Sequence, residues 1–273
     1  MITKGKSSYI PYLKKIWKEC FKDNDSYIDF FFNNRYSDDS VVVKIVDGIP
    51  VAMLFVFYAN LILNGVCKKV GYVYAVSTLE KYRGRGISTE LMEYANKNFD
   101  LDGTFLVPAS ESLFKFYEDR GYNKAFYLKE VSFDVFDSDK NIHISYGVEP
   151  SEYKLLRDNM FSCDGYVSWG EESLEYALKE NEFVGGKNYS IFYNGNKYAV
   201  MGYIDKDRFF ARESVIADGD LKDVLNLIAK KEGCKSVYTR IDVKRNVEGN
   251  DIPFGSIKGI DGVFNGYFNI ALD

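Results

Sequence analysis

Hydrophobic and polar positions follow two different periodicities around the stretch 70–92, first that of a strand and then that of a helix. Val70, Tyr72, Tyr74 and Val76 occupy every second position of a β-branched and aromatic run, which predicts a strand over residues 70–78. The apolar residues that follow recur at the spacing of one helix face: Ile87, Leu91, Tyr94 or Ala95, and Phe99. The pattern therefore predicts a strand that turns into a helix through the sequence Arg-Gly-Arg-Gly at 83–86.

Similar patterns fill the rest of the first half. They predict helices at residues 8–21, 27–33 and 110–120, and strands at 2–6, 40–46, 49–63, 103–108 and 124–136. Asp47-Gly48 and Asn64-Gly65 are hairpin signals, while Ser26 and Ser110 are expected to cap the helices that follow them. This order predicts an α/β (α+β) layout around a mixed sheet.

The polar stretch 137–141 is a plausible linker, and the second half repeats the element order of the first. It predicts helices at 150–161, 171–180 and 221–231, and strands at 142–146, 189–193, 197–205, 208–217, 234–240 and 264–272. We therefore expect two domains, residues 1–136 and 141–273, each a mixed, mostly antiparallel sheet flanked by helices.

Composition narrows the function. A net charge of −5 and a pI near 5.2 argue against a general nucleic-acid binder and permit cationic substrates such as amines. The chain contains no apolar run long enough to span a bilayer and its N-terminus lacks a signal-peptide core, so no membrane partner and a cytoplasmic location are expected. Four scattered cysteines and a single histidine, His143, predict neither disulfides nor a metal site.

The segment at 83–86 carries the candidate chemistry. A glycine loop between a strand and a helix presents backbone N–H groups at the positive end of the helix dipole, which suits a diphosphate. Simple turn chemistry with two solvated arginines is the alternative. The dinucleotide fingerprint would need a glycine at Thr89, and no Gly-Lys-Ser/Thr sequence follows as in nucleotide hydrolases.

Arg83-x-x-Gly86-x-Ser88 resembles the Arg/Gln-x-x-Gly-x-Gly/Ala signature of the GCN5-related N-acetyltransferases, with Ser88 where the family prefers Gly or Ala. The resemblance, which covers about the first half of the chain, implies acetyl-coenzyme A as co-substrate. It implies that pantetheine pairs with a strand edge and the diphosphate with the loop. The cofactor-binding residues it implies are Val76, Ser77, Thr78, Arg83, Gly84, Arg85, Gly86, Ile87, Ser88, Thr89 and Ser110.

The family resemblance also suggests a catalytic group. Tyr117-x-x-x-Gly121-Tyr122 is similar to the family's Tyr-x-x-x-Gly-Phe/Tyr segment, and this implies that Tyr117 is the general acid toward the leaving thiolate. A phenol is protonated at neutral pH, as an acid must be. The base stays open between Glu111, Glu80, the terminal carboxylate of Asp273 and water.

Pro108-Ala-Ser-Glu111 is similar to the Ala-Ser-Glu of the enhanced-intracellular-survival-type acetyltransferases, which place a degenerate second acetyltransferase fold behind the active one. The second half here has Ala-Asp-Gly-Asp at 217–220 in place of the glycine loop, and acidic residues would repel a diphosphate. The second domain is therefore expected to be degenerate. The third, sterol-carrier-like domain of that group is not expected, because little chain follows Arg240.

Together these features predict a cytosolic N-acetyltransferase that transfers an acetyl group to a primary amine of a small molecule or peptide. A non-catalytic acyl-coenzyme A-binding sensor or scaffold is the alternative of a different class. Transfer of a longer acyl group, transfer to a hydroxyl, and assembly as a homodimer are left open by the sequence.

Overall fold

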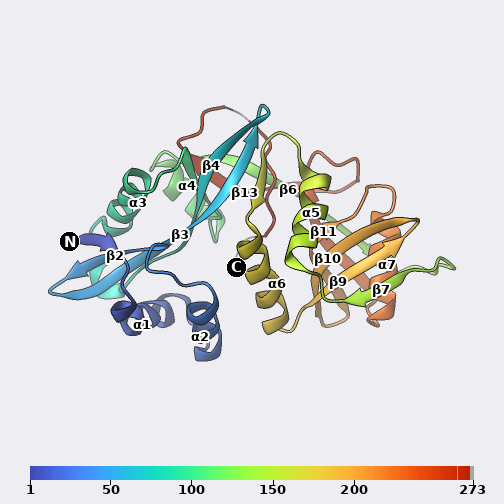
Figure 1. The fold of residues 1–273 in the computed structure, drawn as a ribbon, viewed down its shortest axis with the longest axis horizontal. Helices are drawn as coiled ribbons and strands as arrows, with labels where there is room; N and C mark the ends of the chain where they lie inside the picture. Colours follow the sequence, from blue (N-terminus) through green and yellow to red (C-terminus); the bar gives the residue numbers. More distant parts are fainter. Residues whose placement is uncertain (263, 271–273) are drawn as a thin grey trace. The chain divides into compact units, whose positions relative to one another are not determined.

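The computed structural model describes residues 1–262 and 264–270 (Figure 1). Contacts between residues divide them into two compact units that interleave along the sequence. The first unit comprises Met1–Ala59, Lys68–Asn123 and Ser256–Asp261; the second comprises Asn60–Cys67, Lys124–Gly255 and the described residues from Gly262 onward. The domain limits expected from the sequence, 1–136 and 141–273, remain a prediction.

The first unit consists of parallel and antiparallel strands with flanking helices (Figure 1). Its elements are β1 (Ile2–Lys4), α1 (Ile10–Phe21), α2 (Asp25–Asn34), β2 (Val41–Val46), β3 (Ile49–Leu63), β4 (Val66–Thr78), α3 (Ile87–Asn98), β5 (Gly103–Leu106) and α4 (Glu111–Glu118). The strand order is β1-β2-β3-β4-β5, followed by the end of β13 (Asn250–Lys258). The predicted hairpins at Asp47-Gly48 and Asn64-Gly65 are confirmed, with positive φ at all four residues.

Alternation along β3 sends its side chains into two separate cores. Ala52, Leu54 and Val56 pack with the apolar face of α3. The intervening Phe55 meets the aromatic side chains of α1 and α2, with its ring centroid 5.0 Å from that of Phe31. Trp17 lies 4.4 Å from Phe31, and both are fully buried. The aromatic residues of α2 therefore serve largely to hold α1 and α2 on the sheet.

Helix α2 begins differently from the prediction. Its N-cap is Asn24, whose side-chain oxygen accepts a hydrogen bond from the backbone N–H of Tyr27 at 2.8 Å. The predicted cap Ser26 is wrong, since Ser26 lies inside the helix and its hydroxyl donates to Asn24 Oδ1. Serine and asparagine both cap helices, and here it is Asn24 that accepts from the free N–H group of the first turn.

Strand β13 is the principal element that sequence patterns missed. Its residues Ser256–Lys258 pair antiparallel with Leu106–Thr104 of β5, so a segment far along the chain completes the sheet of the first unit. Pro253 interrupts the strand signal, because proline is rare inside strands. The last strand predicted at 264–272 is wrong over the described residues 264–270, where Gly266 and Tyr267 form isolated bridges.

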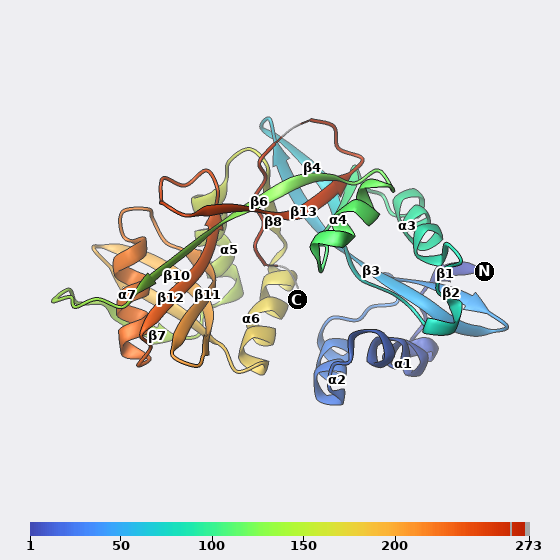
Figure 2. The ribbon, with the colours of Figure 1, turned by 180° about the vertical axis from the view of Figure 1, so that it is seen from behind.

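The second unit is also built from parallel and antiparallel strands with flanking helices (Figure 2). Its elements are β6 (Asn123–Asp134), β7 (His143–Tyr146), α5 (Pro150–Phe161), β8 (Tyr166–Trp169), α6 (Glu171–Phe183), β9 (Lys187–Tyr193), β10 (Asn196–Asp205), β11 (Arg208–Val215), α7 (Leu221–Lys231), β12 (Ser236–Asp242) and the first part of β13. The strand order is β13-β6-β12-β11-β10-β9-β7. Helix α7 covers one face, and α5 and α6 pack on β9, β10 and β11.

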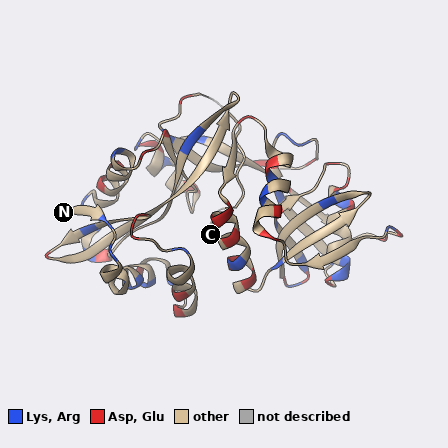
Figure 3. Cartoon of the chain, viewed as in Figure 1, with Lys and Arg blue, Asp and Glu red and all other residues tan. Residues whose placement is uncertain are grey.

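The turn that precedes α7 carries the acidic sequence Ala-Asp-Gly-Asp at 217–220. Asp218 forms an ion pair with Arg245 at 2.5 Å, and Asp220 accepts a hydrogen bond from the Tyr198 hydroxyl at 2.6 Å. These carboxylates are therefore engaged by the unit's own side chains. Figure 3 shows further acidic residues at the start of α6, where Glu171 and Glu172 occupy the first turn.

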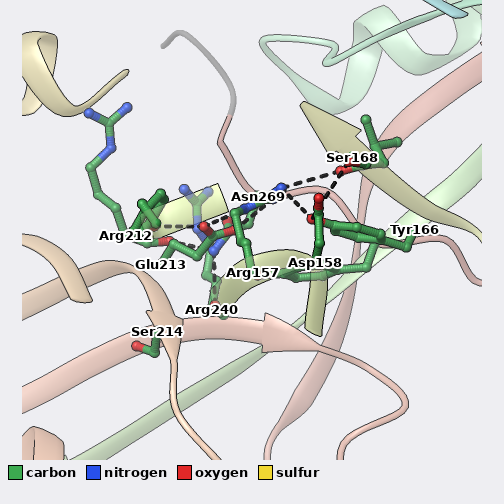
Figure 4. Close-up of polar contacts among 12 residues, drawn as sticks. Arg157, Asp158, Tyr166, Ser168, Arg212, Glu213, Ser214, Arg240 and Asn269 are labelled. Carbon is green, nitrogen blue, oxygen red and sulfur yellow. Dashed lines mark hydrogen bonds and ion pairs between the residues drawn. The ribbon is translucent and has the colours of Figure 1, made fainter. Parts of the chain in front are cut away.

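A fully buried ion pair lies between α5 and β11 (Figure 4). Arg157 donates to both carboxylate oxygens of Glu213, with Nε to Oε2 at 2.7 Å and the second contact at 2.9 Å. The hydroxyls of Tyr153 and Tyr267 donate to the same carboxylate. Burial by itself lowers the pKa of the Arg157 guanidinium, but the Glu213 carboxylate raises it well above the usual range. The Arg157 guanidinium therefore stays charged, and the Glu213 carboxylate is its counterion.

We expect Glu213→Gln to lower the free energy of unfolding by about 3–5 kcal/mol, because it leaves the Arg157 charge buried without a counterion. The matched control is Glu175→Gln, which removes the exposed pair with Lys179 on α6. That change should cost no more than about 0.5 kcal/mol. Urea unfolding followed by circular dichroism measures both. Equal losses in the two variants would show that the buried pair does not stabilise the unit.

Candidate active site in the first unit

The loop between β4 and α3 is built around two glycines in the left-handed region. Gly84 has φ of 75° and Gly86 has φ of 76°, and a Cβ on either residue would meet nothing within 4 Å. Gly86 is the N-cap of α3, so the first backbone N–H groups of the helix lie directly behind it. The predicted strand, glycine loop and helix are therefore present, and the loop exposes main chain at a helix N-terminus.

Both loop arginines hold the turn in its conformation. Arg83 Nε donates to the carbonyl oxygen of Thr78 at 2.9 Å, which ties the loop to the end of β4. Arg85 donates to the carbonyl oxygen of Lys81 at 3.0 Å. Both side chains are nevertheless exposed, and their positive charges lie in the loop that precedes α3.

The first turn of α3 combines an anchor with two accessible hydroxyls. Ile87 is buried in the cluster that α3 forms with β3. Ser88 and Thr89 are partly exposed, and Thr89 Oγ1 accepts a hydrogen bond from Arg120 Nε at 2.9 Å.

Strands β4 and β5 separate before the loop. They are parallel, and their pairing covers Val70–Tyr72, although β4 continues to Thr78. Ala75 has φ of 50°, a strained value for a residue with a side chain. Val76 and Thr78 are partly exposed; Ser77 is buried, and its Oγ has no hydrogen-bond partner among the described residues. The end of β4 therefore offers polar groups that an extended chain could satisfy.

Tyr117 projects from α4 into the same core as α3. It is 9% exposed and belongs to the cluster that contains Ile87 and Leu91. Its ring meets that of Tyr122 edge to face, with centroids 5.8 Å apart. Burial raises the pKa of the Tyr117 phenol, while the positive charge of Arg120 opposes the rise. The phenol is therefore protonated throughout the neutral range, as a proton donor must be.

The remaining described candidates, Ser110, Glu111 and Glu80, lie on the surface. Ser110 is the exposed N-cap of α4, and its hydroxyl lies 3.0 Å from that of Ser112. Glu111 and Glu80 are both exposed, and the backbone N–H of Glu80 donates to Glu19 at 2.8 Å. Asp273, whose terminal carboxylate was a candidate base, lies outside the described residues. The roles of all the predicted site residues stay predictions.

Two residues of this region escaped the sequence patterns. The positive φ of Ala75 has no sequence signal, because alanine rarely adopts it. Arg120 lies within the motif Tyr117-x-x-Arg120-Gly121, but its hydrogen bond to Thr89 could not be predicted because it joins residues 31 positions apart. No group of three or more potential metal ligands gathers in the part of the chain that the structure describes. Nor is any described helix long and apolar enough to cross a bilayer.

Comparison with known proteins relates part of the chain to a family. Residues 1–125 match the family model described as an acetyltransferase (GNAT) domain. The comparison with curated proteins gives no match. The fold likeness to solved acetyltransferases extends over most of the chain, at identities that establish the fold alone. The acetyltransferase (GNAT) match over residues 1–125 confirms the family resemblance drawn from the sequence of this part of the chain.

Three solved structures illustrate the similarity. A GCN5-related N-acetyltransferase from Anabaena variabilis is 14% identical with a TM-score of 0.74, covering 94% of this chain and 72% of its own. A probable N-acyltransferase of unknown function from Enterococcus faecalis is 14% identical with a TM-score of 0.72, covering 94% and 71%. Eis1 from Mycobacterium abscessus is 9% identical with a TM-score of 0.68, covering 94% and 73%.

We expect Gly86→Ala to reduce the free energy of unfolding by about 1–2 kcal/mol, because a Cβ is strained at this φ even where space is open. Gly86→Asn should lose less, since asparagine tolerates the left-handed region. Gly185→Ala is the control: φ is 89° and its surroundings are equally open, so its loss should be similar. Chemical denaturation measures all three. Unchanged stability of Gly86→Ala would contradict a left-handed loop.

Proposed function

We propose that this protein is an acetyl-coenzyme A-dependent N-acetyltransferase that acetylates a primary amine of a small molecule or peptide. The single observation that carries the proposal is the glycine loop opening α3 directly after β4 has separated from β5. In this proposal residues 1–136 hold the active domain. The second half, residues 141–273, is a degenerate repeat without a cofactor of its own.

The residues present fit the co-substrate chemically. Main-chain N–H groups of Gly86–Thr89 and the charges of Arg83 and Arg85 suit a diphosphate. The end of β4 suits the amide groups of pantetheine, and the buried, unpartnered Ser77 Oγ supplies a further polar group. Ser110 is the outermost proposed contact, at the exposed start of α4.

When bound, the thioester supplies the acetyl group. A backbone N–H near Val76 would polarise the thioester carbonyl, and the attacking amine would approach as the neutral base within a ternary complex. Tyr117 would donate its phenolic proton to the sulfur as the carbon–sulfur bond breaks, leaving the O–H electron pair on the phenolate. The products are an amide and the free thiol. Ordered water, Glu111, Glu80 or the terminal carboxylate would take the proton from the amine.

Calorimetric titration with acetyl-coenzyme A and coenzyme A tests the cofactor assignment. We expect wild-type binding with a Kd of about 1–100 μM and a loss of tenfold or more, about 1.4 kcal/mol, in Gly86→Asp. An aspartate there adds strain and a charge that repels the diphosphate. Gly185→Asp is the matched control, because it adds the same residue at a similar φ in the second unit. Absence of binding to the wild type would remove the assignment.

Tyr117→Phe separates an enzyme from a sensor. We expect turnover of acetyl-coenzyme A with an amine panel to fall by roughly 10²-fold, because the leaving thiolate loses its acid. Affinity for acetyl-coenzyme A should change little. The assay is thiol release with calorimetry alongside. Binding without turnover in the wild type would instead favour the alternative function, a non-catalytic acyl-coenzyme A-binding sensor or scaffold.

A further inference from the structure

Arg120 links the end of α4 to the first turn of α3. Its Nε donates to Thr89 Oγ1 at 2.9 Å, and a second guanidinium nitrogen donates to the carbonyl oxygen of Phe116 at 2.6 Å. The guanidinium also lies 3.4 Å from the centroid of the Phe116 ring. Two directed hydrogen bonds and a stacked ring fix one orientation of this planar group, which a lysine could not reproduce.

The end of α4 is further constrained by β13. Lys258 Nζ donates to the carbonyl oxygen of Arg120 at 2.7 Å, and both residues belong to the first unit. Cations at a helix C-terminus interact favourably with the helix dipole. The position of α4 relative to α3 therefore depends on contacts at Arg120, on its side chain as well as its backbone.

Tyr117 is close to this linked group. The backbone N–H of Arg120 donates to the carbonyl oxygen of Tyr117 at 3.0 Å, forming a 3₁₀-type turn. In such a turn, residues three positions apart lie one above the other. The positive charge of Arg120 accordingly acts on the phenol and lowers its pKa, against the larger effect of burial. The guanidinium thus joins the end of α4 to α3 through Thr89, and its positive charge acts on the Tyr117 phenol.

We propose that Arg120 is a positioning residue for acetyl transfer: it holds the segment that carries Tyr117 against the helix that begins at the glycine loop. The inference rests on the proposed function. In the step concerned, the thiolate sulfur gains the phenolic proton, the electron pair of the O–H bond stays on Tyr117, and the phenolate regains a proton from solvent after the product thiol has formed.

A double-mutant cycle tests this role in the full-length protein, using Arg120→Gln, Tyr117→Phe and the combined variant. We expect Arg120→Gln to lower kcat for thiol release from acetyl-coenzyme A by roughly tenfold, as for a coupled pair in one network. The calorimetric Kd for acetyl-coenzyme A should stay within about twofold. In the Tyr117→Phe background, the same change should have almost no effect on kcat, because the group that Arg120 serves is gone.

Two further variants distinguish the contributions. Arg120→Lys keeps the charge but loses the fixed geometry, so its kcat should fall between wild type and Arg120→Gln. Lys115→Gln is the matched control, since it removes one positive charge from α4 at an exposed position paired with Asp119. It should leave kcat unchanged. Thermal unfolding of each variant shows that the fold is intact.

The outcomes separate the two proposals. Loss of kcat in Arg120→Gln that disappears in the Tyr117→Phe background supports the inference. Equal fractional losses in both backgrounds, or wild-type kcat in Arg120→Gln while Tyr117→Phe is slow, overturn it and leave the proposed function standing. A wild-type protein that neither binds acetyl-coenzyme A nor releases thiol overturns the proposed function and the inference together.

Discussion

The separation of two parallel strands is the constraint on which the proposed active site depends. If β4 paired with β5 along its whole length, the sheet ladder would use the main-chain groups of Val76–Thr78. Pairing that ends at Tyr72 leaves this edge for another extended chain, and the glycine loop follows immediately. Strand β5 is held from its other side by β13, so the separation does not cost β5 its place in the sheet. Because β4 separates from β5, an unpaired strand edge is followed directly by the glycine loop and the N-terminus of α3.

The two units use different means to stabilise their sheets. In the first, aromatic side chains from α1 and α2 and the apolar face of α3 cover opposite faces of β3. In the second, α5 is tied to β11 by a buried ion pair with tyrosine hydroxyls around it. The turn before α7 is filled by carboxylates already bonded within the unit. The second unit therefore adds buried and partly buried charged groups to its apolar packing.

Sequence patterns predicted what depends on neighbours along the chain. The strand, loop and helix around 83–86 follow from alternation, two glycines and helical spacing, and the hairpins follow from their turn residues. Features created by distant contacts were missed. Strand β13 pairs with residues about 150 positions away and contains Pro253. The strained φ of Ala75 and the bond from Arg120 to Thr89 leave no trace in local composition.

The place of β13 in the first sheet has a consequence for how the chain is made. Ribosomes add about 5–20 residues per second, so the partner of β5 emerges roughly 8–30 s after β5 itself. Throughout that interval the second unit is being synthesised while one strand edge of the first stays open. Exposed edges invite pairing with other chains. The sheet of the nascent first unit therefore cannot be completed until β13 has been synthesised, after most of the second unit.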